Sequence, residues 1–534
     1  MGTEFKKPIP AGQIKEQRLT EEMASEQPTE LSGNFEADLQ HLRSLFHDSS
    51  DLVIRRFRLP IPEDLELAMF YIDGLVDTRV VDQDIMRSLL HLSRMESVAE
   101  KLKPGNALDK IKAYLLAAGE IEASGEIKNI LHTILSGDTV LLISGSKEAI
   151  IVNSRGFETR GVQEPTIEAV VRGPREGFSE NIRTNTGLIR RRIKDPDLVV
   201  ETAIIGRRTG TDIAFLYIKD IANPNIVADI KAQVQNIEID AVLESGYVEQ
   251  LVKAHGASLF PQMQATERPD KAAAGILEGR VAIIVDGSPF VLLAPVVWIQ
   301  FFQSPEDYYE HSWLSSFIRL IRLAATVFSL FLSGIYVALT SFHPEMIPTT
   351  LALALAAART GVPFSLLAEI LIMELLVEII REASVRLPGP IGPTVGIVGG
   401  LILGEASVRA GIVSPLTVIV VAITAIGSFA TPNQSTAISI RLLRFPFIFL
   451  GASFGLIGIT AGIILLVIHL AGLESWGIPY MAPYAPYDPT GQGDTVLRRD
   501  FLFQRTRPRF LKPLDRYRLP GSGFDKEGSD GTQS

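Results

Sequence analysis

Short apolar runs alternate with polar turns over the first 155 residues of the chain. Apolar residues at helical spacing predict one helix at 35–46 and another at 81–92. Runs rich in β-branched and aromatic residues predict strands at 51–59 and 65–73. This alternation of helical and strand patterns is typical of a small α/β unit.

Two further strand pairs carry the signal of a β-hairpin. The first pair is expected at 138–144 and 148–153, and the second at 199–205 and 212–218. A helix follows the second pair, with Asn223 as its expected N-cap ahead of a proline. The first half of the chain is therefore expected to contain two small α/β units of mixed sheet.

Long apolar blocks follow one another beyond about residue 280. Four blocks are long enough to cross a bilayer as a helix, at 317–342, 363–380, 411–430 and 445–473. Three blocks are shorter, which is typical of re-entrant, interfacial or buried core segments, at 289–302, 346–358 and 393–404. The expected fold is an α/β cytoplasmic region, followed by an all-α multi-pass transmembrane domain with re-entrant segments.

The patterns divide the chain into six parts. These are a disordered N-terminal arm (1–34), a first soluble α/β subdomain (35–155), a second (156–255), a linker and the segment that enters the membrane (256–316), a transmembrane domain (317–485), and a basic, partly disordered C-terminal tail (486–534). The arm is polar and charged, and it lacks the apolar core of a secretory signal.

Composition narrows the possible functions. The 534 residues carry a formal net charge of −10, which gives no general attraction to nucleic acid. The chain has no cysteine, so disulfides, thiolate chemistry and cysteine metal sites are excluded. The eight histidines form no metal-binding motif, and no catalytic constellation is visible. We therefore expect no enzyme activity, no cofactor and no metal.

Charge near the apolar blocks predicts their orientation. Arg319 and Arg322 begin the first block, and the tail is strongly basic, so both should lie on the cytoplasmic side. If both ends of the chain lie on the cytoplasmic side, the number of membrane crossings must be even, and four crossings meet that condition. The sequence RLLRF at 441–445 conflicts with that count, because it would lie outside. Aromatic residues from Trp476 to Tyr484 are expected at the membrane interface.

The block at 363–380 and the residues just after it carry glutamates, which are costly in a bilayer. On a helix, Glu374, Glu378 and Glu382 form one stripe, and Arg381 lies three residues after Glu378. Lipid cannot face this stripe, so protein or water must. One interpretation is an ion-pair cluster inside the bundle that only fixes packing. The other is a hydrated cation path, as in the acidic rings of cation-selective pores.

Helix-breaking residues follow the glutamates directly. Pro390, Gly392 and Pro393 lie in the sequence LPGPIGPTVGIVGG, which interrupts any helix there repeatedly. Irregular backbone at membrane depth is tolerated where it lines a cavity or is covered by protein. We therefore include these three residues with Glu374, Glu378, Arg381 and Glu382 as pore or gating candidates.

A basic stretch at 172–197 stands out in an acidic chain. Its arginines are Arg172, Arg175, Arg183, Arg190, Arg191 and Arg192. They could pair with local carboxylates on a solvated face, contact a neighbouring subunit through bidentate bonds, or bind an anion. No Walker loop or dinucleotide fingerprint accompanies them.

Several long motifs make the chain resemble the A subunit of GerA-type spore germinant receptors. They are RGPREGFSENIRTNTGLIRRRIKDPDL, FPQMQATERPDKAAAGILEGRVAIIVDGSPFVLLAPVVWIQFFQSPEDYY and MELLVEIIREASVRLPGPIGPTVGIVGGLILGEASVRAGIVSP, with RLLRFPF as a shorter match. The resemblance covers about residues 40–485.

The resemblance implies a multi-pass protein of the inner spore membrane, with its soluble half in the spore core. It implies a homo-oligomer, with a pentamer the leading proposal, that works with a permease-like B subunit and a lipoprotein C subunit. Nutrient binding would open a path for monovalent cations. In such a ring, Arg175, Arg183 and Arg190–Arg192 would join neighbouring soluble domains.

Three other interpretations stay open. A secondary transporter would bind substrate at its broken helices, although no repeat is visible between the halves of the membrane region. A relative of the SpoVA group would amplify the same germination response. A scaffold protein would use the glutamates only for packing.

Overall fold

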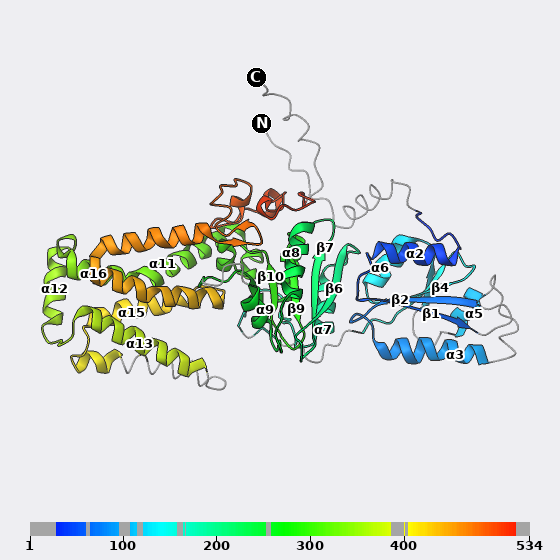
Figure 1. Ribbon diagram of the computed structural model, residues 1–534, viewed down its shortest axis with the longest axis horizontal. Helices are drawn as coiled ribbons and strands as arrows, with labels where there is room; N and C mark the ends of the chain where they lie inside the picture. The colour runs from blue at the N-terminus through cyan, green and yellow to red at the C-terminus, as the bar shows by residue number, and fades with distance from the viewer. Residues whose placement is uncertain are drawn as a thin grey trace, which may run out of the picture.

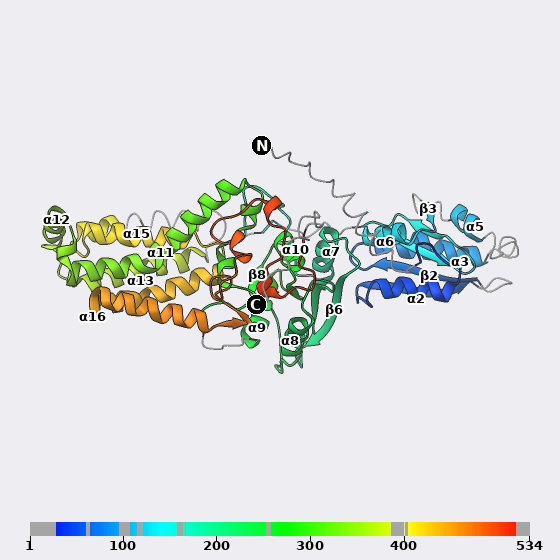
Figure 2. The same ribbon diagram turned by 90° about the horizontal axis from the view of Figure 1, so that it is seen from above.

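The chain forms an elongated molecule with three parts in a row (Figures 1 and 2). A computed structural model describes residues 28–59, 65–94, 107–114, 121–156, 164–165, 167–252, 258–385, 400 and 404–518. A helical bundle occupies one end, and two α/β units follow it, with the N-terminal unit farthest from the bundle (Figure 1). The two units expected from the sequence are therefore present.

The first α/β unit is a five-stranded sheet with helices on both faces. Its strands are β1 (Leu52–Leu59), β2 (Leu65–Ile72), β3 (Ile121–Ser124), β4 (Thr139–Ile143) and β5 (Ala149–Val152), in the spatial order β1-β2-β4-β5-β3. Its helical segments are α2 (Phe35–Leu45), η1 (Val80–Met86), α3 (Arg87–Arg94), α5 (Ala107–Tyr114) and α6 (Ile127–Leu135).

The second unit repeats this arrangement. Its strands are β6 (Leu198–Ile205), β7 (Thr211–Ile218), β8 (Gln264–Thr266), β9 (Val281–Val285) and β10 (Val291–Ala294), in the order β6-β7-β9-β10-β8. Its helices are α7 (Ile182–Arg192), α8 (Pro224–Gln235), α9 (Ser245–Leu251) and α10 (Pro269–Leu277). In both units the chain forms a helix, two strands, helical segments, one strand, a helix and two strands.

Strand β2 shows why each sheet needs helices on both faces. Its even and odd positions point to opposite faces, and both sets are buried. Phe70 packs with α2 and α6, whereas Met69 packs with η1, α3 and α5. In the second unit, Leu216 packs with α7 and α10, and Phe215 with α8 and α9. Each unit is therefore a three-layer structure with two apolar cores.

Several elements predicted from the pattern are confirmed. The hairpins β4–β5 and β6–β7 form as expected, and Asn223 caps α8 by accepting a hydrogen bond from the backbone N–H of Asn225. The expectation of mixed sheets is wrong, because every paired strand in the described residues of both units is antiparallel.

The second unit reaches further along the chain than residue 255. Strands β8, β9 and β10 come from 256–316, the range expected to be a linker and the segment that enters the membrane. The apolar block at 289–302 forms β10 and the short helix η3 (Trp298–Phe302), instead of a re-entrant segment. Its length fitted a membrane segment, but β10 lies between β9 and β8, where both faces are covered.

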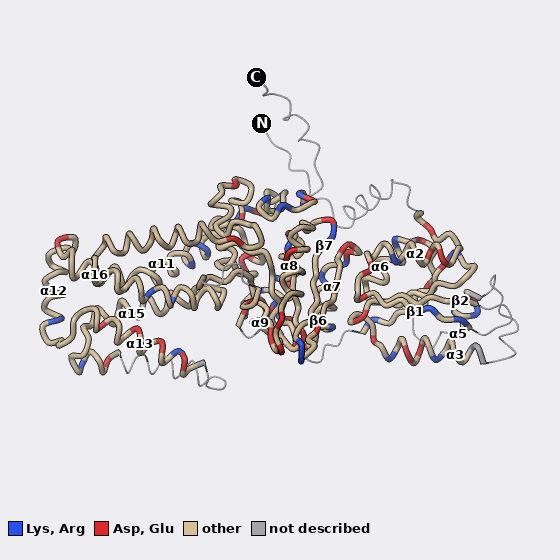
Figure 3. The backbone as a smooth tube through the Cα atoms, in the orientation of Figure 1, with Lys and Arg blue, Asp and Glu red and all other residues tan. Residues whose placement is uncertain are grey.

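The bundle contains the apolar helices. They are α11 (Ser312–Phe342), α12 (Thr349–Arg359), α13 (Leu366–Val385), α15 (Pro415–Ser428) and α16 (Gln434–Gly472). Two of them, α11 and α16, are long and apolar enough to cross a membrane. Most of the bundle lacks charged residues, which gather in the α/β units, the tail and along α13 (Figure 3).

Helix α16 doubles back on itself (Figure 1). Gly455 has φ 60° and ψ −144°, which interrupts the helix. A Cβ placed on Gly462 would lie 2.7 Å from the ring of Phe447, although 15 residues of straight helix would separate the two by about 22 Å. The block at 445–473, expected to be one span, therefore forms parts of two antiparallel legs.

Replacing Gly455 by alanine should destabilise the bundle by about 1–3 kcal/mol, because only glycine adopts this backbone conformation without strain. A Cβ there would also lie 3.0 Å from His343 Nε2 and from Phe342 Cβ. Thermal unfolding of the purified chain in detergent measures the loss. Gly472→Ala is the matched control, since its Cβ would meet nothing within 4 Å. Equal stability of the two variants would contradict the assigned turn.

The chain returns from α16 to the second unit. Tyr480 is fully buried beside Phe301 and donates a hydrogen bond to the carbonyl of Pro261. Trp476 and Tyr484 pack against the apolar core beside α8 and α9. These aromatic residues pack against the second unit and the end of α16, because the chain folds back there, and their expected place at a membrane interface stays a prediction.

Candidate functional site

Helix α13 carries the predicted glutamate stripe into the bundle. Its sequence is rich in Leu, Glu, Ile and Ala and has no Gly or Pro, which favours a continuous helix. It packs against α11, α15 and α16. Glu369, Glu374 and Glu378 therefore face other helices, as the sequence predicts for side chains that lipid cannot face.

Glu374 lies at the centre of the bundle and is completely buried. One carboxylate oxygen accepts hydrogen bonds from Ser333 Oγ of α11 at 2.7 Å and from Thr424 Oγ1 of α15 at 3.1 Å. The other oxygen pairs with Arg444 Nη1 of α16. Three helices therefore converge on this one carboxylate.

Arg444 is equally well satisfied. Its side chain is 1% exposed. Nε donates to the carbonyl of Ser329 at 2.7 Å, and Nη2 donates to Ser329 Oγ at 2.8 Å and to the carbonyl of Thr424 at 3.2 Å. A buried charge is tolerated only when it is paired and hydrogen-bonded, and both members of this pair meet that condition.

One turn further along α13, Glu378 makes a more exposed pair. Its carboxylate lies 2.9 Å from Arg441 Nη1 and 3.5 Å from Arg381 Nη1. Arg381 also donates to Ser428 Oγ at 2.8 Å and lies over the ring of Phe429. The Glu378 side chain is 27% exposed, against 0% for Glu374.

We call Glu374, Glu378, Arg381, Arg441 and Arg444 the carboxylate–arginine network. Glu382, the last residue of the stripe, is exposed and lies beside it on α13. Arg441 and Arg444 belong to RLLRF, which conflicted with the expected number of crossings. Both arginines lie on the leg of α16 that precedes its reversal, and this leg packs against the glutamate stripe of α13. Two glutamates, Glu374 and Glu378, thus share three arginines within the network.

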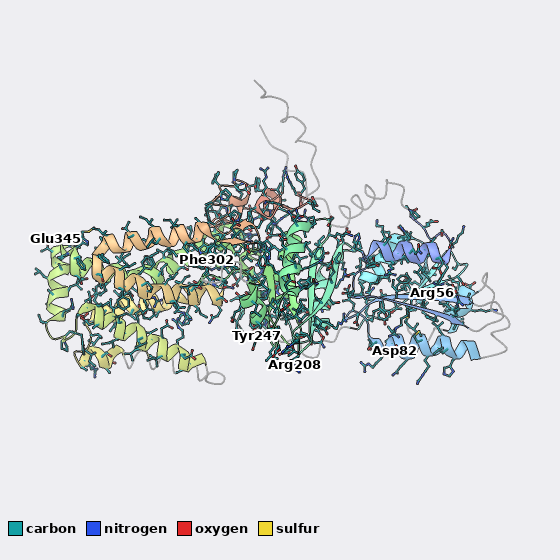
Figure 4. The ribbon with its side chains drawn as sticks, in the orientation of Figure 1. Arg56, Asp82, Arg208, Tyr247, Phe302 and Glu345 are labelled. Atoms are coloured by element: carbon teal, nitrogen blue, oxygen red, sulfur yellow. The ribbon has the colours of Figure 1, made fainter. Side chains whose placement is uncertain are left out.

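Glu369 lies at the end of α13 that is farther from the α/β units, and its contacts are separate from the network. It is fully buried, pairs with Arg359 and accepts hydrogen bonds from the Ser414 backbone and from Thr417 Oγ1. It therefore joins α12, α13 and the start of α15. Glu345, near Arg359 in sequence, marks this end of the bundle (Figure 4).

The comparisons identify the family. The family model described as Bacillus/Clostridium GerA spore germination protein matches residues 40–510. The chain belongs to the GerA spore germination protein family. Spore germination protein KA of Bacillus subtilis (strain 168) is 41% identical over 493 residues, which cover 92% of this chain and 89% of that protein. Spore germination protein GerLA of Bacillus cereus is 40% identical, covering 91% of this chain and 97% of that protein.

A solved structure is also similar to part of this GerA-family chain. It is the N-terminal domain of the A subunit of the Bacillus megaterium spore germinant receptor GerK3, with 35% sequence identity and a TM-score of 0.41. The match covers 52% of this chain and 100% of that one. The family matches confirm the resemblance to GerA-type A subunits that the sequence motifs indicate.

The remaining pore candidates of the GerA-family chain, Pro390, Gly392 and Pro393, lie outside the described residues. Within the described part, no group of three His, Asp or Glu side chains could hold a metal ion.

The arginines of the basic stretch pair within the chain. Arg172 lies 3.6 Å from Glu310, Arg175 lies 3.4 Å from Glu164, and Arg183 lies 3.5 Å from Asp73. Arg191 and Arg192 both bond Glu176. Arg190 is buried and binds Asp51 of the first α/β unit. Glu164 and Glu176 are local partners, as one interpretation of the sequence expects, but Glu310, Asp73 and Asp51 are distant in sequence. A contact to a second subunit remains a prediction.

Sequence reasoning missed a second polar cluster where α11 begins. Arg319 Nε donates to Asp307 at 2.9 Å, and its Nη1 donates to Asp494 at 2.8 Å. Tyr308 donates to Asp494 at 2.7 Å, and burial followed by the Asp494 charge raises the Tyr308 pKa well above its usual value. Part of the signal was present, because Asp307 lies only 12 positions before Arg319, but Asp494 is 175 positions away.

Proposed function

We propose that this GerA-family A subunit is embedded in the inner spore membrane, with its α/β units in the spore core. Several copies, with a pentamer the leading arrangement, would surround an axis through which monovalent cations pass when germination begins. A permease-like B subunit would sense the nutrient, and a lipoprotein C subunit would complete the receptor.

The bundle's dimensions support the membrane placement. Helix α11 has 31 residues and is about 46 Å long, which exceeds the roughly 30 Å of a bilayer's hydrocarbon core. Arg319 and Arg322 lie at the end of α11 next to the α/β units. This agrees with positive residues on the cytoplasmic side.

The gradient of exposure along α13 carries the cation-path proposal. Glu374 is buried, Glu378 is partly exposed, and Glu382 is exposed. A carboxylate row that becomes more accessible toward the α/β units suits the inner mouth of a cation path. In this conformation three arginines balance three glutamates, so the row offers cations no net negative charge. Opening would then require Arg381 and Arg441 to move away from Glu378.

Exposed arginines of the second α/β unit supply contacts for the proposed ring. The side chains of Arg172 and Arg175 are 66% and 72% exposed, and that of Arg183 is 49% exposed. Exposed ion pairs contribute little within one chain, so these arginines can exchange partners at low cost. Arg190 is buried in its own chain, so its proposed role is to orient the two units that form the contact.

Replacing both Glu378 and Glu382 by glutamine should slow potassium release from germinating spores at least tenfold, because the accessible carboxylates of the path lose their charge. The measurement is potassium efflux after nutrient addition, in spores with wild-type amounts of the receptor. Glu405→Gln is the matched control, since Glu405 is an exposed glutamate of the same bundle that pairs with Arg409 on the surface.

Release at the wild-type rate from the double variant, with normal receptor assembly, would instead support the packing interpretation of the stripe. Reconstitution of the purified subunits in liposomes separates the two, because it reports cation flux without the rest of the germination response.

A further inference from the structure

A cavity of about 450 Å³ lies where the second α/β unit, the segment before α11 and the C-terminal tail meet. Its wall comes from α10, from β10, from residues 300–309 and from the tail at 501–518. Phe302, labelled in Figure 4, belongs to the segment before α11 but packs against the bundle. We call this space the junction cavity. Its volume is typical of sites for small organic molecules.

The junction cavity has an unbalanced charge on one wall. Glu278 pairs with Arg280 at 2.8 Å and with Arg518 at 2.6 Å, so two guanidinium groups share one carboxylate. Burial raises the pKa of Glu278, but the two arginines outweigh burial and hold that pKa below its usual value. The carboxylate is therefore ionised, and the three groups together keep one positive charge.

Arg280 has a free donor at this wall. The residue is 4% exposed, and its buried Nε has no hydrogen-bond partner in the described part of the chain. Only Nη2 donates to Glu278. A buried guanidinium N–H without an acceptor costs free energy, and the Arg280 guanidinium must rotate before this N–H can reach an anion in the cavity.

The other cavity walls are largely apolar or aromatic. Leu293, Pro305, Tyr308 and Phe501 line it, together with Ala274. Tyr308 already donates its hydroxyl to Asp494, so it presents mainly its ring. The remaining charges on the wall are balanced: Asp270 pairs with Arg268, Lys271 with Glu168, and Arg507 with Asp515.

We propose that the junction cavity binds a small organic monoanion, a carboxylate on an apolar body, with the carboxylate against Arg280 and Arg518 and the body against Leu293 and Phe501. A single negative charge balances the wall, whereas a doubly charged phosphate would leave an excess. The ligand would touch both the tail and the residues before α11. It would therefore hold the tail against the second unit and the base of the bundle.

Binding of 3-phenylpropionate to the purified full-length chain in neutral-lipid nanodiscs tests the proposal. Titration calorimetry should show saturable binding, at least tenfold tighter than for the uncharged 3-phenylpropionamide. Arg280→Gln should weaken carboxylate binding at least tenfold. Ala274→Phe should do the same by filling the cavity while Arg280 is retained. Arg208→Gln, which removes an exposed arginine of the second unit away from the cavity (Figure 4), should bind like the wild type.

Three results would overturn the proposal: no saturable binding of the carboxylate to the wild type, equal affinity for the carboxylate and the amide, or unchanged affinity in Ala274→Phe. Thermal unfolding of each variant shows whether it is folded. If Arg280→Gln fails to fold, Ala274→Phe and the amide decide the outcome, since neither alters a buried charge.

Discussion

Arg444→Met should destabilise the bundle by about 3–5 kcal/mol, because the substitution leaves the Glu374 carboxylate buried without its charge partner. Methionine fills similar space but donates no hydrogen bond, so the Ser329 and Thr424 carbonyls also lose a donor. Thermal unfolding of the purified chain in one detergent, with the yield of folded protein, measures the loss. We expect little folded protein at the temperature where the wild type is half unfolded.

A second substitution separates charge from packing. Adding Glu374→Gln to Arg444→Met removes both buried charges, and Ser333 and Thr424 can still donate to the glutamine oxygen. The double variant should therefore recover most of the lost stability. Arg441→Met is the matched control: Glu378 is partly exposed and keeps Arg381, so the loss should stay below about 1 kcal/mol. A single Arg444→Met variant as stable as Arg441→Met would refute the assigned pairing.

The carboxylate–arginine network shows where sequence reasoning stops. Helical spacing was enough to place Glu374, Glu378 and Glu382 on one stripe and to keep that stripe away from lipid. It could not identify Arg444 as the partner, because 70 positions separate Arg444 from Glu374. The partner also depends on the reversal at Gly455. A glycine within a long apolar block is common, and only its positive φ marks the turn.

The α/β units show the same division between local and distant information. Strand pairs joined by short turns, such as β6 and β7, were predictable because both partners lie within one window of sequence. The strand in the block at 289–302 was not predictable in this way. Its apolar residues suit a strand only because β8 and β9 pair with β10 on either side. The repeated strand order of the two units is likewise a property of tertiary pairing, and the loops that differ between them hide it in the sequence.

The contact between the two α/β units is also made by a buried ion pair. Arg190 of α7 donates to Asp51 through Nε at 2.7 Å and through Nη2 at 2.9 Å, and both side chains are 1% exposed. Nη2 also donates to Ser49 Oγ at 2.9 Å. Beside this pair, the Ser50 backbone N–H donates to the carbonyl of Val200 in β6. The residues that precede β1 are thereby fixed to the second unit.

Arg190→Met should cost about 3–5 kcal/mol, because Asp51 would stay buried without a partner. The loss should concentrate at the contact between the units, since each unit has its own apolar cores. Hydrogen exchange of the full-length chain should therefore show faster exchange at the Ser50 amide than at amides within β2 and β7. Thermal unfolding should separate into two transitions, one for each unit.

Two further variants test whether the loss of stability comes from the unpaired Asp51 charge. Asp51→Asn with Arg190→Met removes both charges and should recover part of the stability, because the asparagine oxygen can still accept from Ser49 Oγ. Arg175→Met removes an exposed arginine of the same basic stretch, whose 3.4 Å pair with Glu164 is open to water, and should cost less than about 1 kcal/mol. If Arg190→Met matched Arg175→Met and Ser50 kept its protection, the orientation of the two units would depend on backbone pairing and close packing instead, such as the contact of Gly74 with Gly187.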